Sequence, residues 1–126
     1  MFVNLHTNVA LYGQKTRAFV VGINKYRHYD NLTNAVRDAE SFKDMLERRG
    51  VKFITCLVNC TISELRKAFG KFVESLKEGD VAVVYFAGHG CEYNNAYRLF
   101  AISEGEQSNI IKDCMNLLSM INRLAI

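Results

Sequence analysis

The sequence predicts a single α/β domain in which helices cover both faces of a mostly parallel sheet. Two nearly unbroken apolar runs, residues 17–23 and 81–86, are typical of buried strands. Other segments place apolar residues at helical spacing and alternate with the strands along the chain. This alternation is the pattern of parallel strands joined by helical crossovers. With 126 residues, the chain is long enough for one hydrophobic core.

The amino-terminal part of the chain is divided into a lead-in and the start of the domain. Residues 1–16 show no clear pattern and are expected to lead into a domain over 17–126. Residues 17–23 predict the first strand. The following segment, 24–34, is polar and rich in turn formers, and it is long enough to carry function. Residues 35–49 then predict an amphipathic helix, which the following glycine is suited to end.

The middle of the domain supplies a second strand and a second helix. Residues 51–58 predict the strand. Thr61 and Glu64 have the spacing of a capping box, in which each side chain satisfies a free backbone donor of the helix start. The predicted helix ends before Gly79. Its apolar residues form one stripe: Ile62, Leu65, Phe69, Phe72, Val73 and Leu76.

The carboxyl-terminal third begins with the third strand, residues 81–86. Residues 97–102 predict a short extended piece, either an edge strand or a hairpin arm, and 103–109 a polar loop. Residues 110–124 predict an amphipathic helix. No buried strand follows this helix, so the fold is expected to be incomplete at its C-terminal end. One edge of the 81–86 strand is therefore expected to be open and to promote association.

Composition and charge exclude several classes of function. Apolar residues make up 49% and charged residues 23%, which is ordinary for a soluble globular protein. The net charge of +3 is scattered, with no basic stripe, which argues against nucleic acid as a partner. The apolar runs are too short to span a bilayer, and the first residues lack the features of a signal peptide. We therefore expect a cytoplasmic protein with no membrane partner.

The cysteines argue against a structural metal. Cys56, Cys60, Cys91 and Cys114 form no Cys-x-x-Cys pair, and no histidine follows at zinc-finger spacing. In a reducing compartment they are expected to be free thiols. Neither a P-loop nor a dinucleotide-binding glycine motif is present, so no cofactor is expected.

The Gly88-His89-Gly90 sequence follows directly on the apolar strand over 81–86 and Ala87. Two glycines beside one imidazole predict a shaped loop, because glycine contributes no packing and costs conformational entropy. Histidine is the side chain best suited to proton transfer near neutral pH. Open α/β sheets place their chemistry at the carboxyl ends of strands, so His89 is a candidate catalytic residue.

Three linked motifs then indicate a family. Residues 20–27 (VVGINKYR), 32–39 (LTNAVRDA) and 85–90 (YFAGHG) occur in this order and at these spacings. Together they resemble the large catalytic subunit of the caspase-like cysteine peptidases, and more closely paracaspases and metacaspases than true caspases. The resemblance extends over 17–126. It implies a three-layer sandwich with a mostly parallel central sheet, of which this chain would be a partial catalytic domain.

The resemblance implies roles for His89 and Gly90. The histidine at the position of His89 is the general base or orienting partner of a cysteine thiolate in this family. A free thiol has a pKa of about 8.5, so a neighbouring imidazole raises its reactive fraction at neutral pH. The glycine at the position of Gly90 offers its backbone N–H to the oxyanion of the tetrahedral intermediate, where the absence of a side chain permits close approach.

Asp38 is implicated in substrate selection by the same resemblance. In metacaspases and paracaspases, the matching aspartate lies in the pocket for the residue before the scissile bond, where a carboxylate selects Arg or Lys. True caspases have an arginine six positions earlier, where this chain has Leu32. Cleavage after basic residues is therefore implied. Asp38 also fits a purely structural role, as an acid that stabilises the first turn of a helix, and both roles can hold.

The nucleophile of the family lies in an Asp-x-Cys context at the end of a strand that follows the last helix. Such a strand is not found within these 126 residues. Cys114 follows Asp113 directly, but it falls on the apolar stripe of the predicted last helix and is expected to be core. Cys91 lies two positions after His89 and is a second candidate. We expect the nucleophile on a downstream segment or another chain, and this chain alone to be inactive.

Three functions are compatible with these observations. The first is a cysteine endopeptidase domain that acts on proteins or peptides with a basic residue before the scissile bond. The second is a non-catalytic, caspase-like pseudoprotease or regulatory module, which would associate with a caspase-like partner or with its own copies. The third is an unrelated α/β binding domain. A downstream strand ending in Asp-x-Cys would favour the first.

Overall fold

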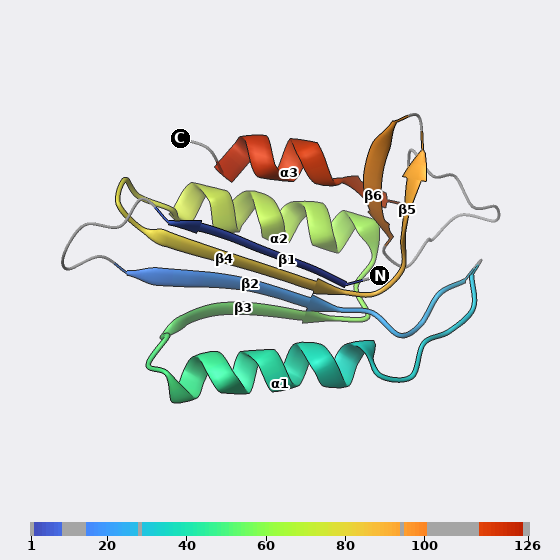
Figure 1. Ribbon diagram of the computed structural model, residues 1–126, viewed down its shortest axis with the longest axis horizontal. Helices are drawn as coiled ribbons and strands as arrows, with labels where there is room; N and C mark the ends of the chain where they lie inside the picture. Colours follow the sequence, from blue (N-terminus) through green and yellow to red (C-terminus); the bar gives the residue numbers. More distant parts are fainter. Residues whose placement is uncertain (1, 9–14, 28, 94, 101–113, 125–126) are drawn as a thin grey trace.

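A computed structural model describes residues 2–8, 15–27, 29–93, 95–100 and 114–124. Figure 1 shows its helices and strands. In chain order they are β1 (Phe2–Asn8), β2 (Thr16–Gly22), α1 (Ala35–Arg48), β3 (Phe53–Val58), α2 (Ile62–Ser75), β4 (Val81–Ala87), β5 (Gly90–Tyr93), β6 (Ala96–Phe100), β7 (Cys114–Asn116) and α3 (Leu117–Leu124).

The main sheet has the strand order β1-β4-β2-β3 among the described residues. Strand β2 pairs in parallel with both β3 and β4, and β1 pairs antiparallel with β4. Helix α1 covers one face of this sheet, while α2 and α3 lie over the other (Figure 1). The predicted α/β architecture, with parallel strands between two helical layers, is confirmed.

Two apolar clusters, one on each face, form the core because side chains alternate along each strand. In β2, Phe19 and Val21 belong to the cluster under α2 and α3, whereas Ala18 and Val20 belong to the cluster under α1. These four side chains are at most 1% exposed. A strand that is buried on both faces needs apolar residues at every position, which explains the unbroken apolar run in the sequence.

The predicted capping box starts α2. The Thr61 hydroxyl accepts a hydrogen bond from the backbone N–H of Glu64 at 3.1 Å, and the Glu64 carboxylate accepts from the Thr61 N–H at 3.4 Å. The predicted stop after α1 is also present, since Gly50 has a φ of 88° just beyond that helix. In the part of the chain that the structure describes, no helix has the length and apolarity needed to cross a membrane.

A second, antiparallel sheet of order β5-β6-β7 begins directly after His89. Strand β6 confirms the extended piece expected from residue 97 onward. The structure contradicts the expected helix over 110–124 in part: residues 114–116 form β7, and α3 begins only at Leu117. Pairing with β6 satisfies the backbone of β7, a tertiary effect that helical periodicity does not contain. Residues 110–113 lie outside the described part.

Strand β1 is a second difference from the sequence prediction. It lies within the segment expected to be a patternless lead-in, and it pairs with β4 from Phe2↔Ala87 to Asn8↔Val81. The edge of β4 that was expected to be open is therefore occupied by β1, while association of the chain stays a prediction. The alternation of Val3 and Leu5 with polar neighbours is the sequence signal for this strand.

Candidate active site

His89 lies at the carboxyl end of β4, separated from it only by Gly88. The loop that follows β2 reaches the same edge of the sheet (Figure 1). The ends of the two strands are joined by a hydrogen bond of 3.0 Å from the Ile23 N–H to the Ala87 carbonyl. His89 therefore lies where the sequence predicts it, at the carboxyl edge of a parallel sheet.

Two groups of the β2–α1 loop hold His89. Its Nε2 atom lies 2.7 Å from the backbone carbonyl oxygen of Asp30. A carbonyl oxygen only accepts hydrogen bonds, so this contact assigns the ring proton to Nε2 and leaves the lone pair on Nδ1. The backbone N–H of His89 donates to the hydroxyl oxygen of Tyr26 at 2.8 Å. The imidazole is thereby oriented with Nδ1 as its basic nitrogen.

The ring of Tyr26 packs against the imidazole of His89. The Tyr26 ring is 8% exposed, and its centroid lies 4.6 Å from that of the imidazole. Burial raises the pKa of Tyr26 to about 12, so its hydroxyl stays protonated at neutral pH. No sequence pattern indicated that Tyr26 and Asp30 hold His89. Their contacts join positions 63 and 59 residues apart in the chain, which no local motif reveals.

Gly88 has to be a glycine because the space around it is filled. A Cβ atom at this position would lie 2.5 Å from the Tyr26 hydroxyl oxygen and 3.0 Å from the Phe86 ring. Real Cβ atoms essentially never approach another atom as closely as the 2.5 Å to Tyr26, and the 3.0 Å to Phe86 is tighter than most Cβ contacts. The glycine before His89 is thus explained by the close approach of Tyr26. Gly90 is the first residue of β5 and pairs with Leu99.

Asparagine side chains give the β2–α1 loop its shape. Asn59, which follows β3 with a φ of 50°, accepts hydrogen bonds from the backbone N–H groups of Asn24 and Lys25 at 2.9 and 3.2 Å. The Asn31 side chain accepts from the Tyr26 N–H at 2.8 Å. Since loop backbone lacks the partners of a helix or sheet, these amide oxygens supply them. The signal in the sequence is the recurrence of asparagine in this turn-rich segment.

Asp38 lies in the first turn of α1, as its structural interpretation requires, and its side chain is exposed. It also lines an open pocket of about 370 Å³. The lining residues are Leu32, Thr33, Asn34, Ala35, Asp38, Ala87 and Gly88. Among them Asp38 is the only charged side chain. The structure therefore brings Asp38 and Leu32 to the same pocket as the residue that precedes His89.

The family of this chain is identified by comparison with known proteins. The family model of the caspase domain matches residues 15–125. The chain belongs to the caspase domain family. The match includes β2, α1, β4 and the glycine-histidine-glycine turn. A comparison with the curated proteins finds no match. The caspase-like cysteine peptidase family that the three motifs indicated is thus confirmed, while the closer likeness to paracaspases and metacaspases stays a prediction.

The two cysteine side chains that the structure describes in this caspase domain, Cys56 and Cys60, both have raised pKa values. Cys60 is 2% exposed, and burial, followed by the charge of Glu64, raises its pKa to about 12. Burial also raises the pKa of Cys56. Neither thiol has the lowered pKa of an activated nucleophile. The backbones of Cys91 and Cys114 lie in β5 and β7, and their side chains are outside the described part. Cys114 is not in a helix, contrary to the sequence prediction.

Metal ligation finds no support in the described part of this caspase domain. Among the side chains that the structure describes, no group of three from His, Cys, Asp or Glu gathers in a way that could hold an ion. At the described edge of the sheet, an oriented imidazole lies beside a pocket lined by the Asp38 carboxylate.

Proposed function

We propose that this caspase domain is the histidine-bearing part of a cysteine endopeptidase of the paracaspase or metacaspase kind. In this proposal it hydrolyses polypeptides after Arg or Lys. The observation that carries the proposal is the orientation of His89 by the Asp30 carbonyl at 2.7 Å, beside the pocket that Asp38 lines. A cytoplasmic location belongs to the proposal, because a reducing compartment keeps the nucleophile a free thiol.

The proposed reaction uses His89 as base and then as acid. Nδ1 takes the proton of the cysteine thiol, and the thiolate attacks the scissile carbonyl carbon. The backbone N–H of Gly90 donates to the oxyanion that forms. The imidazolium then protonates the leaving amine, and a thioester remains on the cysteine. A water molecule, deprotonated by His89, attacks the thioester and releases the carboxylic acid and the free thiol.

Asp38 sets the specificity in this proposal. Its carboxylate is the only charge among the described residues that line the pocket of about 370 Å³, so a substrate cation would meet an opposite charge there. Leu32 contributes an apolar wall and no cation that could bind an acidic side chain. This arrangement favours the long, cationic side chains of Arg and Lys over Asp.

The nucleophile is proposed to come from a segment encoded after residue 126 or from another chain. The raised pKa values of Cys56 and Cys60 support this part of the proposal, because neither the half-buried Cys56 thiol nor the buried Cys60 thiol is suited to attack a substrate. The same observation favours a second candidate function. Without such a segment, the chain would act as a non-catalytic caspase-like module that binds an active relative.

The test measures hydrolysis of fluorogenic peptides that end in Arg, Lys or Asp. The chain is assayed alone and together with the segment encoded after residue 126. We expect cleavage after Arg and Lys only with that segment present. His89→Ala should lower kcat/KM by about a thousandfold, as expected for loss of a general base. Asp38→Asn should lower cleavage after Arg by about a hundredfold.

The matched control for Asp38 is Glu40→Gln, which removes an exposed carboxylate from the same helix outside the pocket. This variant should cleave as the parent does. Cleavage after Asp would contradict the assignment of Asp38, and full activity of His89→Ala would contradict the dyad. If the extended chain cleaves none of these peptides but changes the activity of a caspase-like relative, the second function is correct.

A further inference from the structure

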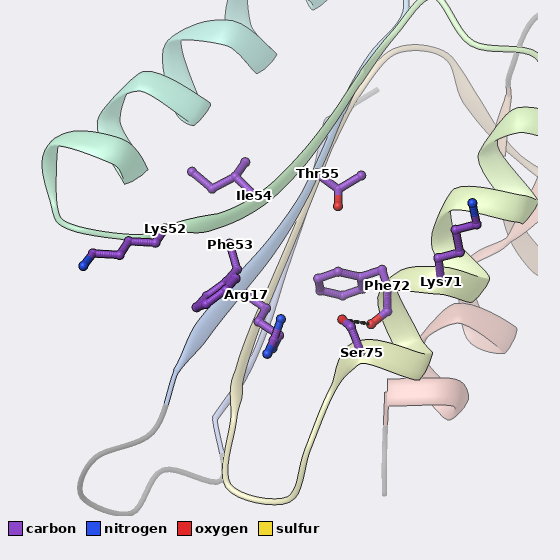
Figure 2. A pocket seen from close by; sticks show the side chains of 8 residues that line it. All are labelled: Arg17, Lys52, Phe53, Ile54, Thr55, Lys71, Phe72 and Ser75. Carbon is purple, nitrogen blue, oxygen red and sulfur yellow. Dashed lines mark hydrogen bonds between the residues drawn. The ribbon is translucent and has the colours of Figure 1, made fainter.

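Two adjoining pockets lie at the end of the sheet opposite to His89, where β2 and β3 begin. Their volumes are about 380 and 450 Å³, and both are lined by Lys52 and Phe53. Figure 2 shows the first pocket, between the start of β3 and helix α2. Because β2, β3 and β4 run in parallel, this region is separated from the candidate active site by the length of the strands.

The charge of this region is strongly positive. The cations that line the two pockets are Lys15, Arg17, Arg49, Lys52 and Lys71, and no Asp or Glu is among the described lining residues. Arg17 is paired with Asp80 at 3.2 Å. Within the part of the chain that the structure describes, Arg49, Lys52 and Lys71 have no carboxylate partner. Five of the 16 Lys and Arg residues of the chain therefore line these two pockets.

An exposed aromatic ring lies among these cations. Phe53 is 41% exposed, which is unusual for a large apolar side chain next to two pockets. The Arg17 guanidinium lies 4.5 Å from the ring centroid, and the Lys15 ammonium lies 5.0 Å from it. The ring is therefore held by cation–π contacts and leaves an apolar surface bordered by positive charge.

Strand β3 adds main-chain groups to this surface. Among the described strands it is the last of the main sheet, with only β2 as a neighbour, so its outer edge has unpaired N–H and C=O groups. Thr55 of β3 and Lys71 and Ser75 of α2 line the same pocket (Figure 2). An unpaired strand facing a helix across a groove is the geometry that accepts an extended peptide as an added strand.

We propose that the groove between β3 and α2 binds an extended acidic segment of a protein partner, which adds a strand to the free edge of β3. Acidic side chains of the segment would meet Lys52 and Lys71, and an apolar one would cover Phe53. A peptide matches the alternating donors and acceptors of a strand edge, whereas a nucleic-acid backbone has no N–H groups to pair with the β3 carbonyls. The site is independent of the peptidase chemistry at His89.

The test uses a labelled peptide of alternating Glu and Val with the length of β3, six residues. Fluorescence anisotropy should show binding to the whole chain that weakens as salt is raised. Lys52→Glu and Lys71→Glu should each weaken binding by about fivefold, since each replaces an attraction by a repulsion at an exposed position. Lys67→Glu is the matched control, an exposed lysine of α2 outside both pockets, and should change binding less than twofold.

Three further ligands, two peptides and one RNA, test the proposal on the unaltered protein. A peptide with proline at alternate positions lacks the N–H groups for strand pairing and should not bind. A peptide of alternating Lys and Val should not bind either. Equal binding of either peptide, or tighter binding of a single-stranded RNA oligonucleotide, would overturn the proposal. So would unchanged affinity in Lys52→Glu and Lys71→Glu, provided that both variants unfold at the same temperature as the parent.

Discussion

His89 gains its orientation from residues that are remote in the chain. The Asp30 carbonyl fixes the proton on Nε2, and the Tyr26 hydroxyl holds the backbone of His89 at 2.8 Å. Both partners belong to one loop, which Asn31 and Asn59 shape in turn. The basic nitrogen is thus available before any substrate binds. This preorganisation is what a general base requires, since its reorganisation would otherwise add to the barrier.

Cys60 should make the stability of the protein depend on pH in the alkaline range. Burial raises the pKa of this thiol from 9.0 to about 12, so the folded state keeps a proton that the unfolded state loses above pH 9. The free energy of unfolding therefore falls as the pH rises from about 9 towards 12 and is unaffected by Cys60 below that window. Urea denaturation at about pH 8 and about pH 10 measures the change.

The control for this prediction is Cys60→Ala, in which the difference between the two pH values should shrink. Tyr26 also has a raised pKa, but its unfolded value is 10.0, so its contribution changes mainly above the chosen range. The prediction fails when the parent chain and Cys60→Ala lose the same stability between the two pH values.

The stability of helix α2 depends on the capping box at its first turn. Thr61→Ala removes the hydroxyl that accepts from the Glu64 N–H and leaves that donor without its partner. We expect the free energy of unfolding to fall by about 1 kcal/mol. Chemical denaturation measures it, and Thr61→Ser, which keeps the hydroxyl, should stay close to the parent. Equal stability of the alanine and serine variants would contradict the role of the capping box.

The elements that could be predicted from the sequence are those with a long internal pattern. The apolar runs of β2 and β4 and the periodicity of α1 and α2 are set by burial along each element. Strand β7 has three residues, and its conformation depends on β6. No periodicity can be read from so short a segment, so the sequence assigned it to a longer helix.

The candidate site likewise contains residues that could be predicted from the sequence and contacts that could not. His89 and Asp38 were found because they lie in motifs whose residues are near in the chain. The pocket that joins Asp38 to Gly88, and the contacts of His89 with Tyr26 and Asp30, arise only when two strand ends meet at one edge of the sheet. Asn59 was missed for this reason too, since its hydrogen bonds to Asn24 and Lys25 cross from one loop to another.

Strand β1 should protect the edge of β4 from pairing with another chain. Deleting residues 1–8 would leave the edge of β4 without its antiparallel neighbour and expose a strand of apolar residues. Since such an edge is a template for pairing with another chain, we expect the deletion variant to associate. Light scattering, compared with the whole chain at equal concentration, measures this. A deletion variant with the same mass as the whole chain would show that β1 does not protect β4.

Strand β1 also fixes an order of events during synthesis of the protein. It precedes the other described strands in the chain, whereas its partner β4 follows both α1 and α2. Strands β2 and β3 and helix α1 can associate before then, through contacts closer in the chain. Strand β1 is therefore among the last of the described strands to join the main sheet, and the nascent chain carries it unpaired until β4 emerges.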